Sequence, residues 1–119
     1  AIESGAYDGV VALGCVIRGE TDHDRYISQA VANGLAALTT QTGIPVAFGV
    51  ITANTPEQAA ARAGGAKGNK GAEAMDALLD AIDGMRRLYD AAADGVPARF
   101  SLSTNPTDKA APGATAGSI

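Results

Sequence analysis

Residues 19–23, with the sequence Gly-Glu-Thr-Asp-His, hold the side chains best suited to chemistry in this chain. They follow a nearly continuous apolar run over residues 7–17, which is typical of a parallel strand buried on both faces. A strand that ends in a glycine turn and then opens a helix leaves backbone N–H groups unpaired. Together with the helix dipole, these groups favour a bound anion such as phosphate. Thr21 adds a hydroxyl donor, and His23, the single histidine of the 119 residues, can transfer protons near neutral pH. The alternative interpretation is an ordinary helix N-terminus that carries a surface histidine.

The elements expected to position this stretch are, in order, strand, helix, strand, helix and helix. Asp22 is the predicted N-cap of the first long helix, whose apolar residues recur every three or four positions. Gly43 is predicted to end that helix, and the second strand is expected at residues 46–51. Thr55, followed by Pro and then Gln three residues on, has the pattern of a capped helix start.

The last helix is expected after a loop at residues 67–71, with Asn69 as its cap. The pattern predicts an α/β fold with a parallel strand–helix–strand unit. Two strands leave both sheet edges open, so we expect this unit not to stand alone. Residues 1–5 are interpreted as the last turn of a helix that Gly5 ends, which places the start of the chain in mid-fold. Residues 1–93 form the predicted domain, and residues 94–119, which have no periodicity, are a predicted disordered tail.

Composition narrows the class of protein. Hydrophobic residues make up 46% of the chain but aromatic residues only 4%, so the expected core is aliphatic and rich in alanine. A net charge of −4 argues against a nucleic-acid surface. Cys15 lies inside the apolar run, which predicts a small buried hydrophobe rather than a nucleophile or disulfide partner. With no apolar stretch long enough to cross a membrane and no signal peptide, the expected location is cytoplasmic.

Four segments in register carry a resemblance to a known family. They are residues 12–23, residues 42–52, residues 55–64 and the Gly-Asn-Lys-Gly of residues 68–71. In order and spacing they resemble lumazine synthase, over about residues 1–93. The resemblance implies a flavodoxin-like, three-layer parallel sheet, of which this chain encodes only part. It also implies pentamers, which in some members build sixty-subunit shells. The family normally begins earlier, so a truncated chain, or a separate chain that supplies the missing N-terminal half, is expected.

The resemblance also implies an activity and its residues. Lumazine synthase condenses 5-amino-6-ribitylaminouracil with 3,4-dihydroxy-2-butanone 4-phosphate, without a cofactor or metal, in riboflavin biosynthesis. His23 matches the histidine assigned to proton transfer. The implied substrate-binding residues are Val16 and Ile17 for the ring pocket, Gly19, Glu20 and Thr21 around the phosphate, and Phe48, Arg62 and Lys70 from the adjacent chain. Their alternative interpretations are a core aromatic for Phe48, a solvated helix arginine for Arg62 and a loop lysine for Lys70.

The chain departs from the family around His23. Asp22 stands where the family usually has proline, and Asp24 and Arg25 stand where it usually has an aromatic residue and an acid. Carboxylates on both sides of His23 would repel phosphate. This leaves open a second class of function, a non-catalytic scaffold or shell subunit derived from the family. A third alternative is a generic phosphate-binding module.

Overall fold

The computed structural model describes residues 1–95. A short 3₁₀ helix opens the chain and ends at Gly5, which adopts the left-handed conformation expected of a helix stop (φ 65°). The elements that follow are β1 (Val10–Ile17), α1 (His23–Thr42), β2 (Val46–Ala53), α2 (Pro56–Arg62), β3 (Ala63–Gly65), β4 (Gly68–Asn69) and α3 (Lys70–Ala93).

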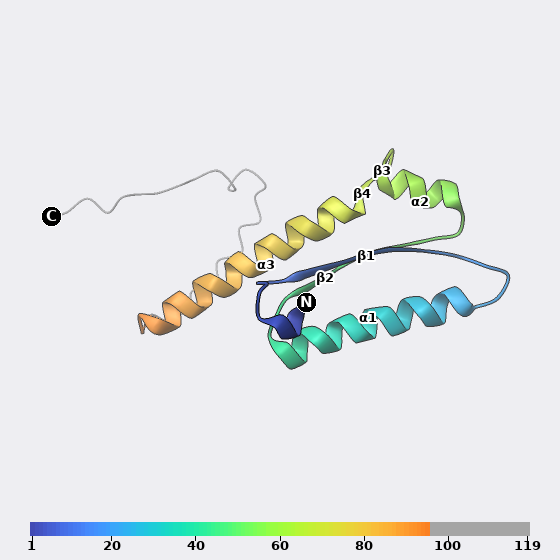
Figure 1. Ribbon diagram of the computed structural model, residues 1–119. Coiled ribbons are helices and arrows are strands. Elements are labelled where there is room, and N and C mark those ends of the chain that lie inside the picture. Colours follow the sequence, from blue (N-terminus) through green and yellow to red (C-terminus); the bar gives the residue numbers. More distant parts are fainter. Residues whose placement is uncertain (96–119) are drawn as a thin grey trace.

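β1 and β2 pair in parallel over their full length, from Val10 opposite Val46 to Ile17 opposite Ala53. α1 makes the crossover between them, so the predicted strand–helix–strand unit is confirmed. Figure 1 shows α1 on one side of the two strands and α3 on the other, which is the three-layer α/β arrangement expected from the sequence. Because the strands are parallel, their carboxyl ends meet at the same end of the sheet.

The two faces of the sheet receive different helices because side chains alternate along a strand. Gly49 is buried against α3, where a Cβ atom on it would lie 3.1 Å from the Cβ atom of Ala74. The neighbouring residue Phe48 therefore points to the opposite face, toward α1. Gly49 lets α3 approach β2 closely on one face of the sheet. The residues of β2 that alternate with Gly49 therefore face α1.

Helix ends follow the predicted signals with one exception. Gly43 ends α1 in the left-handed conformation (φ 69°) and donates to the Thr39 carbonyl. Thr55 caps α2 by accepting from the Gln58 N–H at 3.3 Å, and the Gln58 Oε1 atom accepts from the Asn54 N–H at 3.0 Å. Asp22 occupies the N-cap position of α1, but its side chain makes no capping hydrogen bond, so the predicted cap is wrong in this respect.

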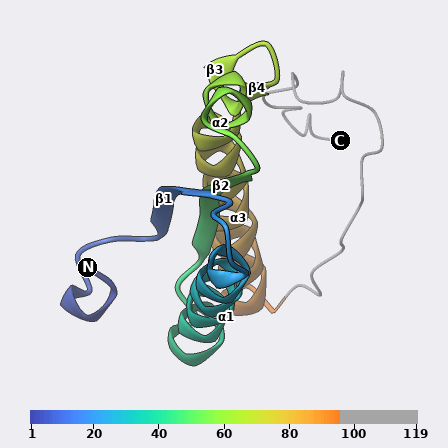
Figure 2. The same ribbon diagram turned by 90° about the vertical axis from the view of Figure 1, so that its right-hand side faces the viewer.

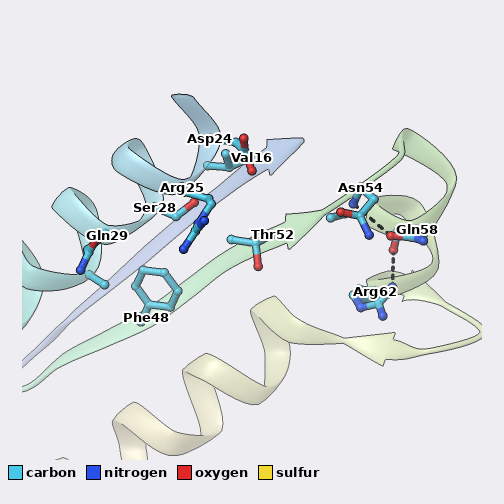
Figure 3. Close-up of a pocket in the computed structure, with 12 residues that line it drawn as sticks. Val16, Asp24, Arg25, Ser28, Gln29, Phe48, Thr52, Asn54, Gln58 and Arg62 are labelled. Carbon is cyan, nitrogen blue, oxygen red and sulfur yellow. Dashed lines mark hydrogen bonds between the residues drawn. The ribbon is translucent and has the colours of Figure 1, made fainter. Parts of the chain in front are cut away.

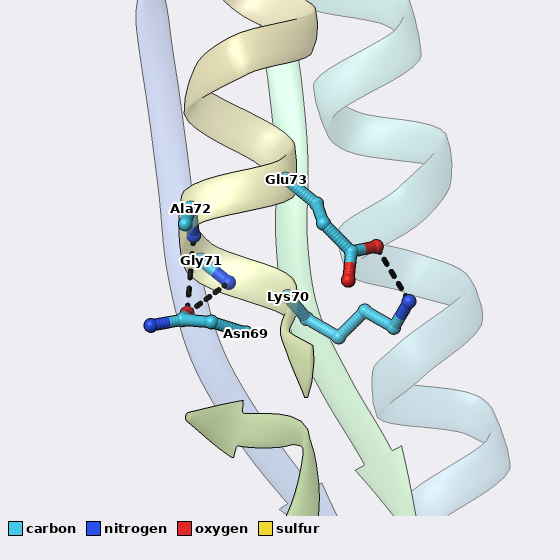
Figure 4. Close-up of polar contacts among 5 residues, drawn as sticks. All are labelled: Asn69, Lys70, Gly71, Ala72 and Glu73. Carbon is cyan, nitrogen blue, oxygen red and sulfur yellow. Dashed lines mark hydrogen bonds and ion pairs between the residues drawn. The ribbon is translucent and has the colours of Figure 1, made fainter. Parts of the chain in front are cut away.

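The start of α3 contains an element that the sequence did not predict. Asn69 caps α3 as expected, with its Oδ1 atom accepting from the N–H groups of Gly71 and Ala72 at 3.1 Å each (Figure 4). The expected loop at residues 67–71 is partly wrong, however, because β3 and β4 form a small antiparallel hairpin there. Gly64 and Gly68 have positive φ values of 112° and 86°, which permit the tight reversal.

β1 is the exposed strand of the sheet. Figure 2 shows it beside β2 with only the N-terminal segment beyond it, while the helices lie around β2. Leu13 is 65% exposed, and Cys15 is also exposed. The prediction of a buried Cys15 is therefore wrong, because within residues 1–95 the helices pack mainly over β2 and leave the faces of β1 largely uncovered. Few apolar side chains in this part of the chain are buried, namely Pro45, Ala59, Ala74 and Leu78.

α3 ends at Ala93, and the predicted tail lies outside the described residues except for Asp94 and Gly95. Within residues 1–95, no helix is both long and apolar enough to cross a membrane.

A candidate substrate groove at the carboxyl ends of the strands

The carboxyl ends of β1 and β2 bring together the start of α1 and all of α2. Residues 18–22 connect β1 to α1, and the Arg18 N–H donates to the Ala53 carbonyl at 2.8 Å, which continues the strand pairing into this connection. α2 begins three residues after β2 ends. A groove of about 730 Å³ lies between these elements (Figure 3). It is lined by Val16, Asp24, Arg25, Ser28, Gln29, Ala32, Phe48, Thr52, Ala53, Asn54, Gln58 and Arg62.

Val16 and Phe48 form the strand wall of the groove. In the register of the sheet, Val16 lies opposite Thr52, and both share the α1 face with Phe48. The Phe48 ring is 43% exposed. A core aromatic would be almost completely buried, so in the described part of the chain Phe48 offers a surface on which a planar ligand can stack.

Arg62 contributes a guanidinium group from the last turn of α2. It is half-buried, and its Nη1 atom donates to the Gln58 carbonyl at 2.9 Å. No carboxylate of residues 1–95 pairs with it. A guanidinium group has five N–H donors, so most of those of Arg62 remain available to an anion in the groove.

The predicted phosphate loop lies at the same end of the sheet but does not line the groove. Gly19, Glu20 and Thr21 are exposed, and their backbone N–H groups have no acceptor within residues 1–95. His23 is the first residue of α1 and is also exposed, and its imidazole makes no hydrogen bond with another described residue. The start of a 20-residue helix thus presents unpaired N–H groups next to an accessible imidazole.

Two further predicted binding residues, Ile17 and Lys70, also lie outside the groove. Ile17 ends β1 and is 40% exposed without lining the groove. Lys70 begins α3, where its Nζ atom pairs with the Glu73 carboxylate at 2.5 Å (Figure 4). Lys70 is therefore engaged on its own helix in this chain.

None of the site residues predicted from the sequence comes from the α1 side of the groove. Arg25, Ser28, Gln29 and Ala32 all come from the first half of α1. Their spacing of three, four and seven residues places them on one helix face, and this periodicity was the signal that could have found them.

Glu57 is the acidic residue in the first turn of α2. A hydrogen bond from the Thr55 side chain, followed by one from its own N–H, lowers the pKa of the Glu57 carboxyl below its ordinary value. Within residues 1–95, no three His, Cys, Asp or Glu side chains lie close enough together to hold a metal ion.

Comparison with known proteins identifies the family. The family model for 6,7-dimethyl-8-ribityllumazine synthase matches residues 1–86. A protein of that name from Deinococcus deserti is 49% identical over 86 residues, which are 72% of this chain and 55% of the relative. Its counterpart from Deinococcus radiodurans is 46% identical over 86 residues, 72% of this chain and 56% of the relative.

The chain thus spans about half the length of the curated relatives it matches. The match runs through β1, α1, β2 and α2 and into α3, so it includes every residue that forms the groove and the loop beside it. The chain belongs to the 6,7-dimethyl-8-ribityllumazine synthase family.

Proposed function

We propose that this chain forms part of an enzyme of riboflavin biosynthesis that condenses 5-amino-6-ribitylaminouracil with 3,4-dihydroxy-2-butanone 4-phosphate. The product is 6,7-dimethyl-8-ribityllumazine, and phosphate and water are lost. The observation that carries the proposal is the groove at the carboxyl ends of β1 and β2, where an exposed aromatic face and an unpaired guanidinium group lie together. The family match supports this choice of substrates.

The phosphate of the four-carbon substrate is held by Arg62 and by the N–H groups of the loop before α1. Gly19, Glu20 and Thr21 supply these N–H groups, which lack an acceptor in the described part of the chain. Arg62 adds paired N–H donors whose geometry matches phosphate oxygens. Val16 and Phe48 enclose the pyrimidine ring, with Ile17 beside them, and Lys70 lies at the rim when its pair with Glu73 opens.

Proton transfer is the role of His23. Imine formation, phosphate elimination and ring closure each move protons, and a histidine at an exposed helix start reaches a substrate without displacing other groups. Bringing the two substrates together contributes most of the rate enhancement. The reaction needs no cofactor.

The site is completed between subunits. His23 and the phosphate loop do not line the groove of their own chain. We therefore propose that they face Phe48, Arg62 and Lys70 of a neighbouring chain in a homopentamer or a sixty-subunit shell. The exposed apolar surface of β1 is covered by further protein, either more of the same polypeptide or a separate chain.

Turnover tests the proposal. The purified protein is mixed with the two substrates, with and without a second polypeptide that carries the part of the Deinococcus deserti relative which this chain does not match. Lumazine absorbance and released phosphate are then followed together. The proposal predicts one phosphate per lumazine. Assemblies that bind both substrates and form no lumazine would rule it out.

A non-catalytic scaffold is the second candidate, because Asp22 and Asp24 place carboxylates on both sides of His23. This candidate predicts pentamers or shells of normal size that do not turn over under any of the conditions above. Light scattering on the samples used for the turnover assay distinguishes the two functions.

A further inference from the structure

Arg25 is the second guanidinium group of the groove. It lies in the first turn of α1, and in Figure 3 its side chain reaches from the helix toward Phe48 and Thr52, while Arg62 lies on the other side of Thr52. The two arginines therefore belong to different walls of one groove, with the exposed Phe48 ring near one of them.

The guanidinium group of Arg25 has no partner within residues 1–95. The same is true of Arg18, which does not line the groove, whereas Arg86 contacts Asp8 at 3.2 Å and Arg87 contacts Asp83. The side chain of Arg25 makes no hydrogen bond or ion pair with another described residue, although Asp24 is its neighbour on the groove wall. A long cationic side chain that loses no donors to the protein keeps all five for a ligand.

The charge of the groove follows from these residues. Two guanidinium groups line it against one carboxylate, that of Asp24, so the groove is positive inside a chain whose net charge is −4. A positive groove in a negative protein selects for anions through both direct contacts and the local potential. The groove therefore favours an anionic ligand, and the exposed Phe48 adds a surface on which a planar group can stack.

We propose that Arg25 is a second anion-binding residue of this groove, which raises its affinity for the phosphate-bearing substrate and offsets the negative charge of Asp24. The inference rests on the proposed function for the identity of that substrate. The family usually has an acid at this position, and an acid would repel an anion. Arg25 is proposed to attract one, so removing its charge should weaken phosphate binding.

Inorganic phosphate is the probe, and its binding to the assembled protein is measured by titration calorimetry at low and high salt. Arg25→Gln removes the charge and keeps most of the length of the side chain. We expect it to weaken phosphate binding about tenfold at low salt, the loss typical of a hydrogen-bonded charge, and less at high salt. Arg25→Glu should weaken binding further, and Arg25→Lys should restore most of it. Arg87→Gln, which makes the same charge change on α3, is the control and should leave the affinity unchanged.

Two further measurements distinguish a failure of the Arg25 role from a failure of the proposed function. They are phosphate binding by Arg62→Gln and turnover of the two substrates. If Arg62→Gln weakens phosphate binding while Arg25→Gln and Arg25→Glu do not, the role of Arg25 is wrong and the proposed function stands. If the Arg25 variants weaken phosphate binding in a protein that forms no lumazine, the role of Arg25 is right and the proposed function fails. Equal weakening by Arg25→Gln and Arg87→Gln would show a general charge effect and would also overturn the inference.

Discussion

At the scale of single residues, the two arginines that line the groove differ from the two arginines of α3 in having no carboxylate partner within residues 1–95. Arg86 and Arg87 are paired with carboxylates at exposed positions, where such pairs contribute little to stability. Arg62 is half-buried, and no carboxylate of residues 1–95 pairs with it. Apart from the bond of its Nη1 atom to the Gln58 carbonyl, its N–H donors therefore remain available to a ligand.

Phosphate should stabilise the protein through Arg62. A ligand that binds only the folded state at about one hundred times its Kd adds about 2.7 kcal/mol to the free energy of unfolding. We expect inorganic phosphate to raise the Tm of the assembled protein and Arg62→Ala to abolish most of that gain. Arg87→Ala, which makes an equal change of charge outside the groove, should keep it. Equal gains for the parent and Arg62→Ala would contradict the role of Arg62.

Asp24 is the only carboxylate that lines the groove in the described part of the chain, and in the proposed function it opposes phosphate binding. Replacing it removes a carboxylate that lines the groove, and the electrostatic repulsion of a phosphate dianion across water corresponds to about a fivefold change in binding. We expect Asp24→Asn to lower the KM for the phosphate-bearing substrate about fivefold. Asp24→Phe, which also supplies the aromatic residue usual in the family, should lower it at least as much. Steady-state kinetics checks this, and an unchanged KM for Asp24→Asn would mean that the Asp24 charge does not reach the phosphate.

At the scale of elements, the close approach of α3 to β2 depends on Gly49. A Cβ atom there would lie 2.6 Å from the Cδ2 atom of Leu13, 3.1 Å from the Ala74 Cβ atom and 3.2 Å from the Ala12 carbonyl oxygen. We expect Gly49→Ala to lower the free energy of unfolding by about 1–3 kcal/mol, as overpacking does. Gly14→Ala is the control, since its Cβ atom would meet only Val50, at 3.6 Å. Denaturant titration of both variants tests this, and equal stabilities would show that α3 does not pack against Gly49.

The elements themselves were largely predictable, because their signals are local. Gly43, Thr55 and Asn69 end or begin helices through contacts with residues at most four positions away, so the sequence alone revealed them. The hairpin of β3 and β4 was missed because strands of three and two residues, containing three glycines, carry no periodicity.

The groove was only partly predictable, since it depends on packing between elements. Phe48 and Arg62 were found through the family resemblance, whereas Arg25 was missed because its position departs from the family. Cys15 was expected to be buried because a run of apolar residues indicates that a strand is suited to a buried position. The run does not show which part of the protein, or which other chain, covers the strand, and in the described residues Cys15 is exposed.

At the scale of the whole molecule, β1 is the less covered of the two strands of the parallel sheet. It pairs with β2 on one side only in the described part of the chain, and its Leu13 side chain is 65% exposed. An uncovered apolar edge strand favours association with further protein. We propose that this association is required for stable folding.

Hydrogen exchange checks the state of β1. In a purified monomer of this chain we expect the amides of β1 to exchange much faster than those in the centre of α3, because few apolar contacts protect them. In the assembled protein, protection of β1 should rise to that of β2. Strong and uniform protection of both strands in a monodisperse monomer would show that the chain needs no partner.

The proposed function depends on His23 acting at the carboxyl ends of the strands, and the turnover of His23→Ala measures this most directly. In the assembled, active protein we expect kcat to fall by about 10–100-fold, because proton transfer is lost while the proximity of the substrates remains. The KM for the phosphate-bearing substrate should change little, since the proposed function assigns phosphate binding to Arg62 and backbone N–H groups. An unchanged kcat would contradict the proposed role, and His23 would then be no more than the residue that begins α1.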